Sequence, residues 1–373
     1  MKKNILKNEG VQAIIASIIC VIVGVLVGYI VLLVINPAGA FDAIVAVLKN
    51  FMTYSRPEAQ MRYFGNTVVK TIPLLMWSLS ILFAYKAGLF NIGAAGQYCV
   101  GICACLYAAL AWGWSWLPCM LLAIVAGCIY GALVGIFKAY FNVNEVISGI
   151  MFNWIGLYFT NMVLSNVKDS SSPYTLTLKS TNPDAILPSF GIDQLFNNNQ
   201  YATIAIPAAI IIAIVIYIIL DKTRLGYEIK ATGFNKSAAK YAGMAEKKNI
   251  IMTLAIAGAL AGLGASFLYQ TGFEEYIVTS SSVPTMGFNG IAAAFLGGLN
   301  PIGAIFSSFF IEHISSGGAY VDKSIYASQI SDLIAAVIIY LCGFVFFVKI
   351  MMNNAIAKHE QKKLENSKKG EKE

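Results

Sequence analysis

Charge is scarce in this chain. Only 12% of its 373 residues are Asp, Glu, Lys or Arg, whereas 58% are hydrophobic. A water-soluble domain carries roughly a quarter charged residues, so the composition excludes a soluble globular protein and indicates a polytopic membrane protein. The net charge of +7 does not indicate a nucleic-acid partner, because the Lys and Arg residues lie in loops and tails between long apolar runs.

The residue types that build catalytic and metal sites are also few. All seven cysteines lie inside apolar runs, where they act as small hydrophobic residues, and no spacing indicates a disulfide framework or a metal site. The two histidines, His313 and His359, have no metal-ligand pattern around them. The glycine-rich Gly-x-x-x-x-Gly-Lys-Ser/Thr loop that cradles ATP phosphates is missing as well. The sequence therefore predicts no catalysis and no cofactor or metal site in this polypeptide.

Apolar runs separated by charge clusters set the expected membrane topology. An uncharged run of about 20 residues crosses a bilayer as a helix, and loops rich in Lys and Arg stay in the cytoplasm. On these rules residues 1–10 form a cytoplasmic N-terminus, residues 11–348 a transmembrane domain and residues 349–373 a basic cytoplasmic tail. Residues 165–200 are polar without a positive excess and form an extracytoplasmic loop. The expected fold class is an all-α polytopic membrane protein with about ten transmembrane helices and both termini in the cytoplasm.

Charge inside the apolar runs is nearly absent. Lys70 lies in the second expected span, residues 68–85, from which its ammonium group can extend outward. Glu312 and Asp332 lie near span ends, where they reach water. A carrier driven by protons or ions usually has buried carboxylates or histidines in its path. Because no such relay is visible, an ion-coupled secondary transporter that works alone is the less favoured alternative. A membrane scaffold or a membrane enzyme is a third alternative, for which the sequence shows no catalytic residues.

One polar loop, residues 221–249, separates two uncharged runs, Tyr201–Leu220 and Ile250–Tyr269. Its excess of Lys and Arg places it in the cytoplasm. Within it, the spacing of residues 224–244 predicts a short amphipathic helix that docks a partner protein, and the alternative is an ordinary solvated loop. The residues expected on one side of this helix are Ile229, Phe234, Ala238, Ala239 and Met244, with Gly233 and Gly243 as breaks.

Two glycine-rich stretches interrupt the apolar runs, one in each half of the chain. Residues 88–97 read Gly-Leu-Phe-Asn-Ile-Gly-Ala-Ala-Gly-Gln, and residues 287–294, in an expected eighth span over residues 276–298, read Gly-Phe-Asn-Gly-Ile-Ala-Ala-Ala. Such paired interruptions indicate broken helices in two related halves and point to a translocation site. Buried amides lose hydrogen bonds if they face lipid, so they either bond neighbouring helices or line a polar path. The candidate pathway residues are Phe90, Asn91, Gln97, Asn153, Phe288 and Asn289.

Four segments together resemble the permease subunits of bacterial ABC importers, in the superfamily that serves branched-chain amino acids and simple sugars, and most closely its nucleoside members. They are Gly88–Gln97, Asn144–Ser148, Gly226–Ala239 and Asn289–Gly298, in the expected order between Thr67 and Gly343. One position departs from the pattern, because Ala95 stands where nucleoside members usually carry an acidic residue. The resemblance implies alternating access driven by a partner ATPase, which binds the ATP and magnesium.

The resemblance also implies partners, a location and a coupling site. The partners are ABC ATPase subunits, a second permease subunit (a paralogue or another copy) and an extracytoplasmic substrate-binding lipoprotein, all at the bacterial cytoplasmic membrane. The small-molecule substrate is expected to be a nucleoside, with simple sugars or branched-chain amino acids as alternatives. The residues implied in ATPase coupling are Gly226, Tyr227, Glu228, Ala231, Gly233, Asn235, Ala238, Ala239 and Gly243.

Overall fold

The computed structural model describes residues 9–284, 286–327, 329–342, 344, 347, 348, 350–354 and 358. Within these residues the fold is helical, and strand-like pairing is limited to two isolated bridges, Lys168 with Thr175 and Tyr174 with Ile277. Six of the described helices are long and apolar enough to cross a membrane. The all-α class is thereby confirmed. Residues 1–8 and most of the expected cytoplasmic tail, His359 included, lie outside the described residues.

The N-terminal elements are α1 (Glu9–Ile35), α2 (Ala40–Lys49), the 3-10 turn η2 (Asn50–Thr53) and α3 (Pro57–Lys86). α2 is amphipathic, because its buried residues recur every three or four positions and pack beside α1 and α14. α3 has 30 residues and is therefore about 45 Å long, which exceeds the roughly 30 Å of a bilayer's hydrocarbon core. The expected second span is the inner part of this longer helix.

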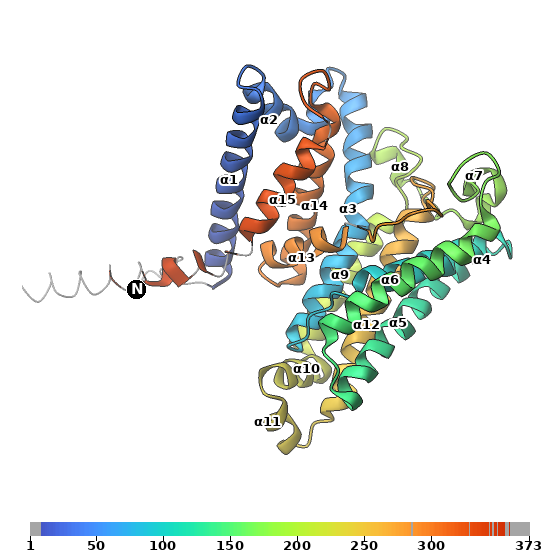
Figure 1. The fold of residues 1–373 in the computed structure, drawn as a ribbon, viewed down its shortest axis with the longest axis vertical. Coiled ribbons are helices and arrows are strands. Elements are labelled where there is room, and N and C mark those ends of the chain that lie inside the picture. Colours follow the sequence, from blue (N-terminus) through green and yellow to red (C-terminus); the bar gives the residue numbers. More distant parts are fainter. Residues whose placement is uncertain are drawn as a thin grey trace, which may run out of the picture.

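A second group of helices packs on one side of α3 (Figure 1). It contains α4 (Ala94–Leu110), α5 (Trp116–Phe141), α6 (Glu145–Leu164) and α12 (Glu246–Tyr269). α5 and α12 touch backbone to backbone, since a Cβ atom on Gly127 of α5 would collide with the carbonyl group of Gly258 on α12. Small residues at such crossings allow close helix packing in membranes, which explains why glycines recur every four residues along α5.

The remaining long helices lie on the other side of α3 or behind it. They are α9 (Ala205–Lys222), α13 (Met286–Leu296), α14 (Pro301–Gly317) and α15 (Ile330–Cys342), and α1, α13, α14 and α15 form a separate lobe in Figure 1. The eighth span expected over residues 276–298 is helical only in α13. Pro284 and the serines before it precede the helix, and 11 residues are too few to cross a bilayer alone. The count of ten crossings therefore stays a prediction.

Short elements occupy the two ends of the molecule. The loop between α6 and α9, called the outer loop after its expected extracytoplasmic side, contains η3 (Ser165–Val167), α7 (Leu178–Thr181), η4 (Pro183–Ala185) and α8 (Ile192–Leu195), and η5 (Gly318–Tyr320) follows α14. At the opposite end, α10 (Arg224–Phe234) and α11 (Lys236–Tyr241) project below α9 and α12 (Figure 1). The polar loop singled out in the sequence is thus a distinct projection at one end of the helical bundle.

Candidate functional site: a projecting helix pair and the helix break it touches

The loop between α9 and α12 folds as two helices rather than one. The side chain of Thr223 accepts a hydrogen bond from the backbone N–H of Gly226 (3.2 Å) and begins α10. Asn235 begins α11 in the same way, because its Oδ1 accepts from the backbone N–H of Ala238 (3.0 Å). Side-chain acceptors at helix starts satisfy otherwise unpaired N–H groups. Asn235 has an extended backbone, so it ends α10 and divides the expected helix in two.

α10 is fastened to the membrane helices on its inner side. Ile229 is fully buried, and the hydroxyl group of Thr232 accepts a buried hydrogen bond from Asn249 of α12 (3.0 Å). At the turn from α9 a Cβ atom on Gly226 would collide with the carbonyl oxygens of Ile219 and Leu220, so the turn requires glycine. α10 therefore moves with α9 and α12 rather than as a free loop.

The outer side of the helix pair carries exposed aromatic residues. Phe234 is 98% exposed and Tyr241 94% exposed, and Tyr227 is exposed as well. The sequence predicts that the apolar residues of this loop share one side of a single helix. In the structure Phe234 and Ala238 are exposed whereas Ile229 and Ala239 are buried, so the four residues do not share one side. The break at Asn235 rotates α11 relative to α10, so helical spacing cannot be carried across it.

The coupling residues expected from the sequence divide into two sets. The exposed ones are Tyr227, Asn235, Ala238 and Gly243. The partly or fully buried ones are Gly226, Glu228, Ala231, Gly233 and Ala239. The first set lies on a surface that a partner can reach. The second set supports that surface or contacts the membrane helices. The two most exposed aromatic residues of the pair, Phe234 and Tyr241, were not among the coupling residues that the resemblance implied, although their spacing of seven residues was visible in the sequence.

Gly233 of α10 rests directly on the break between α3 and α4. A Cβ atom there would lie 2.5 Å from the carbonyl carbon of Ala87 and 2.7 Å from the backbone nitrogen of Gly88. Gly88 has a φ of 69°, a left-handed conformation that glycine adopts readily. Two glycines, one from the projecting loop and one from the broken helix, thus allow backbone contact between the two elements.

Side-chain amides hold the segment that follows Gly88. The Nδ2 of Asn91 donates to Ser80 of α3 (3.0 Å) and to the Oε1 of Gln97 (2.9 Å), and the Nε2 of Gln97 donates back to the Oδ1 of Asn91 (3.1 Å). Asn91 and Gln97 are both buried. A pair of amides that bond each other and a hydroxyl group satisfies most of its polar atoms inside the protein. Phe90 lies beside this pair and is partly buried.

Asn153 fastens the same segment to α6. Its Oδ1 accepts from the backbone N–H of Gly96 (2.7 Å), and its Nδ2 donates to the carbonyl oxygen of Ile92 (2.9 Å). Both are backbone groups at the irregular start of α4, where the helix itself provides no partner. Of the six candidate pathway residues, the structure thus brings Phe90, Asn91, Gln97 and Asn153 together at the start of α4.

The other two candidates lie on α13. Phe288 is 67% exposed and Asn289 is partly buried. The adjacent glycines pack against α3, because a Cβ atom on Gly290 would lie 2.8 Å from the Cβ of the buried Trp77. Contact of any of the six residues with substrate stays a prediction.

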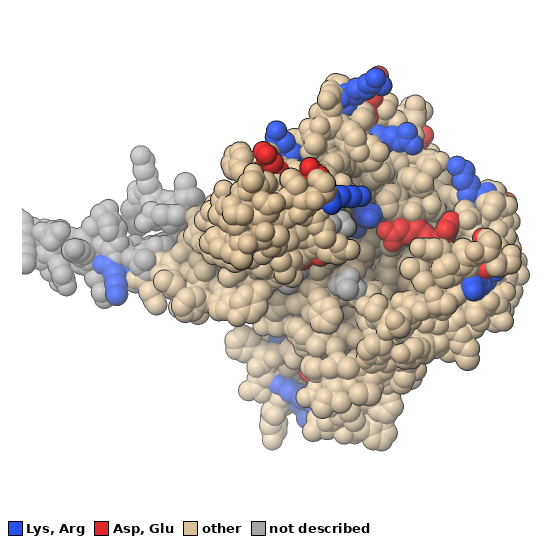
Figure 2. All heavy atoms as spheres, turned by 45° about the horizontal axis from the view of Figure 1, so that its top comes forward, with Lys and Arg blue, Asp and Glu red and all other residues tan. Residues whose placement is uncertain are grey.

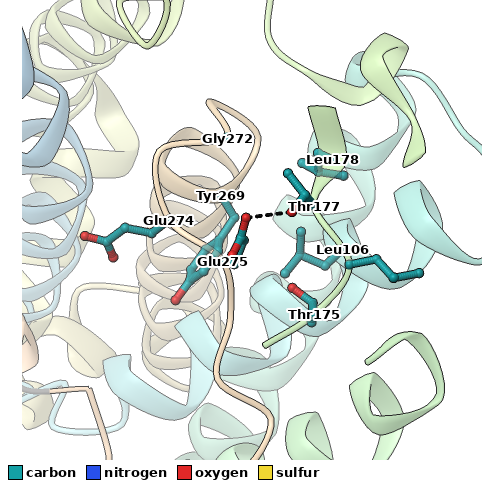
Figure 3. Close-up of a pocket in the computed structure, with 9 residues that line it drawn as sticks. Leu106, Thr175, Thr177, Leu178, Tyr269, Gly272, Glu274 and Glu275 are labelled. Carbon is teal, nitrogen blue, oxygen red and sulfur yellow. Dashed lines mark hydrogen bonds between the residues drawn. The ribbon is translucent and has the colours of Figure 1, made fainter. Parts of the chain in front are cut away.

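A recess under the outer loop shows two neighbouring carboxylates that point in opposite directions (Figure 3). It is lined by Leu106, Thr175, Leu176, Thr177, Leu178, Tyr269, Gly272, Glu274 and Glu275. Glu275 accepts a hydrogen bond from the hydroxyl group of Thr177 (2.8 Å), whereas Glu274 points toward α3 and pairs with Lys70 (3.5 Å). The sequence missed this pair, since residues 70 and 274 lie in different halves of the chain.

Comparisons with known proteins fit this architecture. Residues 63–343 match the family described as branched-chain amino acid transport system / permease component. The chain is 30% identical over 362 residues to the nucleoside ABC transporter permease protein NupB of Lactococcus lactis subsp. cremoris, covering 94% of this chain and 96% of that protein. It is 33% identical over 298 residues to the guanosine ABC transporter permease protein NupP of Bacillus subtilis, covering 79% and 84%.

More distant matches name other solutes. The glucose ABC transporter permease protein TsgB13 of Haloferax volcanii is 26% identical over 299 residues, covering 76% of this chain and 77% of that protein. No solved structure matches the chain. The family match covers most of the described helices, including α10, α11 and both glycine-rich stretches. The chain therefore belongs to the branched-chain amino acid transport system / permease component family of ABC transporter permeases.

Proposed function

We propose that this chain is the membrane-spanning subunit of an ATP-driven importer of nucleosides. The observation that carries this proposal is the 30% identity to a nucleoside permease across 94% of the chain. The second permease subunit, the ATPase subunits and the extracytoplasmic lipoprotein are proposed with it, since a permease of this family has no nucleotide-binding loop of its own.

In this proposal α10 and α11 are the surface on which the ATPase docks. Their exposed aromatic residues, Tyr227, Phe234 and Tyr241, supply the kind of apolar anchors that dominate protein interfaces. ATP binding and hydrolysis move the docked helices. Because Gly233 contacts the backbone at Gly88, this movement displaces the start of α4 and changes access between the two sides of the membrane.

Uptake by the reconstituted complex tests the proposal. Proteoliposomes that contain this chain with its partner subunits should accumulate radiolabelled uridine or adenosine only when ATP is supplied, and ionophores should leave uptake unchanged. ATP-independent uptake that ionophores abolish would instead establish an ion-coupled carrier.

A sugar is the second candidate substrate, because the chain also matches a glucose permease over 76% of its length. Competition separates the two candidates. A hundredfold excess of unlabelled guanosine should abolish uridine uptake, and the same excess of glucose should leave it unchanged. Inhibition by glucose alone would favour the sugar assignment.

A further inference from the structure

Lys70 is a cation within the part of α3 that is expected to span the membrane. It precedes Lys86, at the inner end of α3, by 16 residues, which corresponds to about 24 Å along the helix axis. With Lys86 at the inner boundary of a hydrocarbon core about 30 Å thick, Lys70 lies below the outer boundary, and any tilt of α3 places it deeper. A Lys side chain about 6 Å below the boundary reaches polar surroundings either by extending outward or by facing a water-filled cavity, and charges that line such cavities mark solute paths.

The ammonium group of Lys70 faces a carboxylate and an aromatic ring from the segment after α12. Its Nζ lies 3.5 Å from the Oε1 of Glu274 and 5.3 Å from the ring centroid of Phe273. The ring of Tyr201 packs edge-on against Phe273, with 4.9 Å between centroids. The side chains of Lys70 and Glu274 remain 37% and 42% exposed, so solutes reach them.

A third helix contributes a buried carboxyl group to the same region. Glu312 of α14 is only 8% exposed, and among the described residues only Ser316 donates a hydrogen bond to it (2.6 Å). This carboxyl group is close enough to Lys70, Glu274 and Asp332 to interact electrostatically with them. Figure 2 shows acidic side chains in a hollow of the outer face with basic side chains beside it. Lys70 therefore faces Glu274 directly and lies within electrostatic reach of Glu312.

We propose that this hollow is a nucleoside-binding site, in which Glu274 accepts hydrogen bonds from the ribose hydroxyl groups and the Phe273–Tyr201 pair packs against the base. The inference rests on the proposed function and adds to it the residues that select the solute. Adjacent ribose hydroxyl groups are donors, and a carboxylate is the strongest acceptor for them. Aromatic side chains offer a flat apolar surface to any base.

A structural ion pair is the alternative, in which Lys70 and Glu274 only fasten the segment after α12 to α3. The neighbouring Glu275 provides a matched control, because it points away from α3 and bonds Thr177 (Figure 3). Exchanging Lys70 and Glu274 distinguishes a role in substrate binding from that of a structural ion pair. The double variant Lys70→Glu/Glu274→Lys preserves the ion pair but removes the carboxylate from position 274.

The experiment uses the complete transporter in proteoliposomes with its binding protein and internal ATP. The rates of uptake are measured for uridine and for 2′-deoxyuridine, which lacks one of the ribose hydroxyl groups. We expect Glu274→Gln to lower the uridine rate about tenfold and to bring the uridine-to-deoxyuridine ratio close to one, since a charged acceptor is lost. Phe273→Ala should lower both rates about equally, and Glu275→Gln should keep both within about twofold of the unmodified transporter.

The outcomes are distinct. A ratio that Glu274→Gln leaves unchanged, or full recovery of uridine uptake in the exchanged double variant, would overturn the binding site and leave the nucleoside importer intact. An unmodified transporter that takes up glucose but no uridine would overturn both proposals. Assembly of each variant with its partners, measured by size-exclusion chromatography, separates these results from misfolding.

Discussion

Buried side-chain amides at the start of α4 link this helix to α3 and α6 by hydrogen bonds. Asn153 alone satisfies one backbone donor, the N–H of Gly96, and one backbone acceptor, the carbonyl group of Ile92, that the start of α4 leaves without helical partners. Sequence reasoning identified these amides as polar groups that must be bonded or line a path. It could not decide between the two roles, because the partners of Asn153 lie about 60 residues away in the chain.

Replacement of Asn153 tests the bonding role. Asn153→Ala leaves the N–H of Gly96 and the carbonyl group of Ile92 unpaired in a buried site, so we expect a loss of about 2–4 kcal/mol in stability. Thermal unfolding of the purified complex measures this loss. Asn166→Ala is the matched control, since Asn166 is exposed and bonds only within its own turn. An unchanged midpoint with abolished uptake would assign Asn153 to substrate contact instead.

Gly233 is the residue through which the projecting helices touch the broken helix. A methyl group there would lie 2.5 Å from the carbonyl carbon of Ala87, closer than any relaxed contact, so α10 must shift away from Gly88. We expect Gly233→Ala to lower nucleoside uptake at least tenfold while the ATPase subunits still bind and hydrolyse ATP. The number of ATP molecules hydrolysed per nucleoside taken up measures this uncoupling.

The control for this change is Gly191→Ala in the outer loop, where an added Cβ atom meets no neighbour within 4 Å but the left-handed φ of 86° strains the backbone of any replacement. It tests whether any glycine replacement outside the membrane lowers uptake. Equal loss in both variants, or an unaltered ratio of ATP to nucleoside in Gly233→Ala, would contradict a coupling role for Gly233.

At the scale of elements, composition and periodicity predicted where the long helices lie. They did not predict the residues at which helices end, because those depend on backbone hydrogen bonds. The uncharged runs before and after the polar loop agree closely with α9 and α12. The sequence placed a break in this loop at Gly233, whereas the structure divides the helices at Asn235, because asparagine is compatible both with a helix start and with a polar helical surface. α13 is short for a related reason, since the uncharged residues 276–284 are not helical.

The α10–α11 pair carries a prediction about docking. Because Phe234 and Tyr241 are almost fully exposed, the double variant Phe234→Ala/Tyr241→Ala should fold normally and lose at least tenfold in affinity for the ATPase subunit. Binding of the purified ATPase to the permease in nanodiscs measures this affinity. Phe190→Ala, which removes an exposed aromatic residue from the outer loop, should leave it unchanged. Undiminished binding by the double variant would place the docking surface elsewhere.

The whole molecule divides into two lobes beside α3, with the polar loop at one end and the long outer loop at the other (Figure 1). The bias of Lys and Arg toward one end gave the expected orientation from the sequence alone. The pairing of Lys70 with Glu274 could not be foreseen, since it depends on how the segment after α12 approaches α3 rather than on any local pattern. Long-range charge pairs of this kind become visible only in the folded chain.

Orientation in the membrane is testable with single cysteines at the two ends. Phe234 lies on the projecting helices and Leu195 in the outer loop, and both side chains are exposed. The native cysteines at positions 20, 99, 103, 105 and 119 are buried, which limits background labelling. With the polar loop in the cytoplasm, a membrane-impermeant maleimide should label Leu195→Cys in intact cells and Phe234→Cys only after the cells are permeabilised. Labelling of Phe234→Cys from outside would place the helix pair beyond the reach of any ATPase, and the proposed importer mechanism would then have no means of receiving energy from ATP.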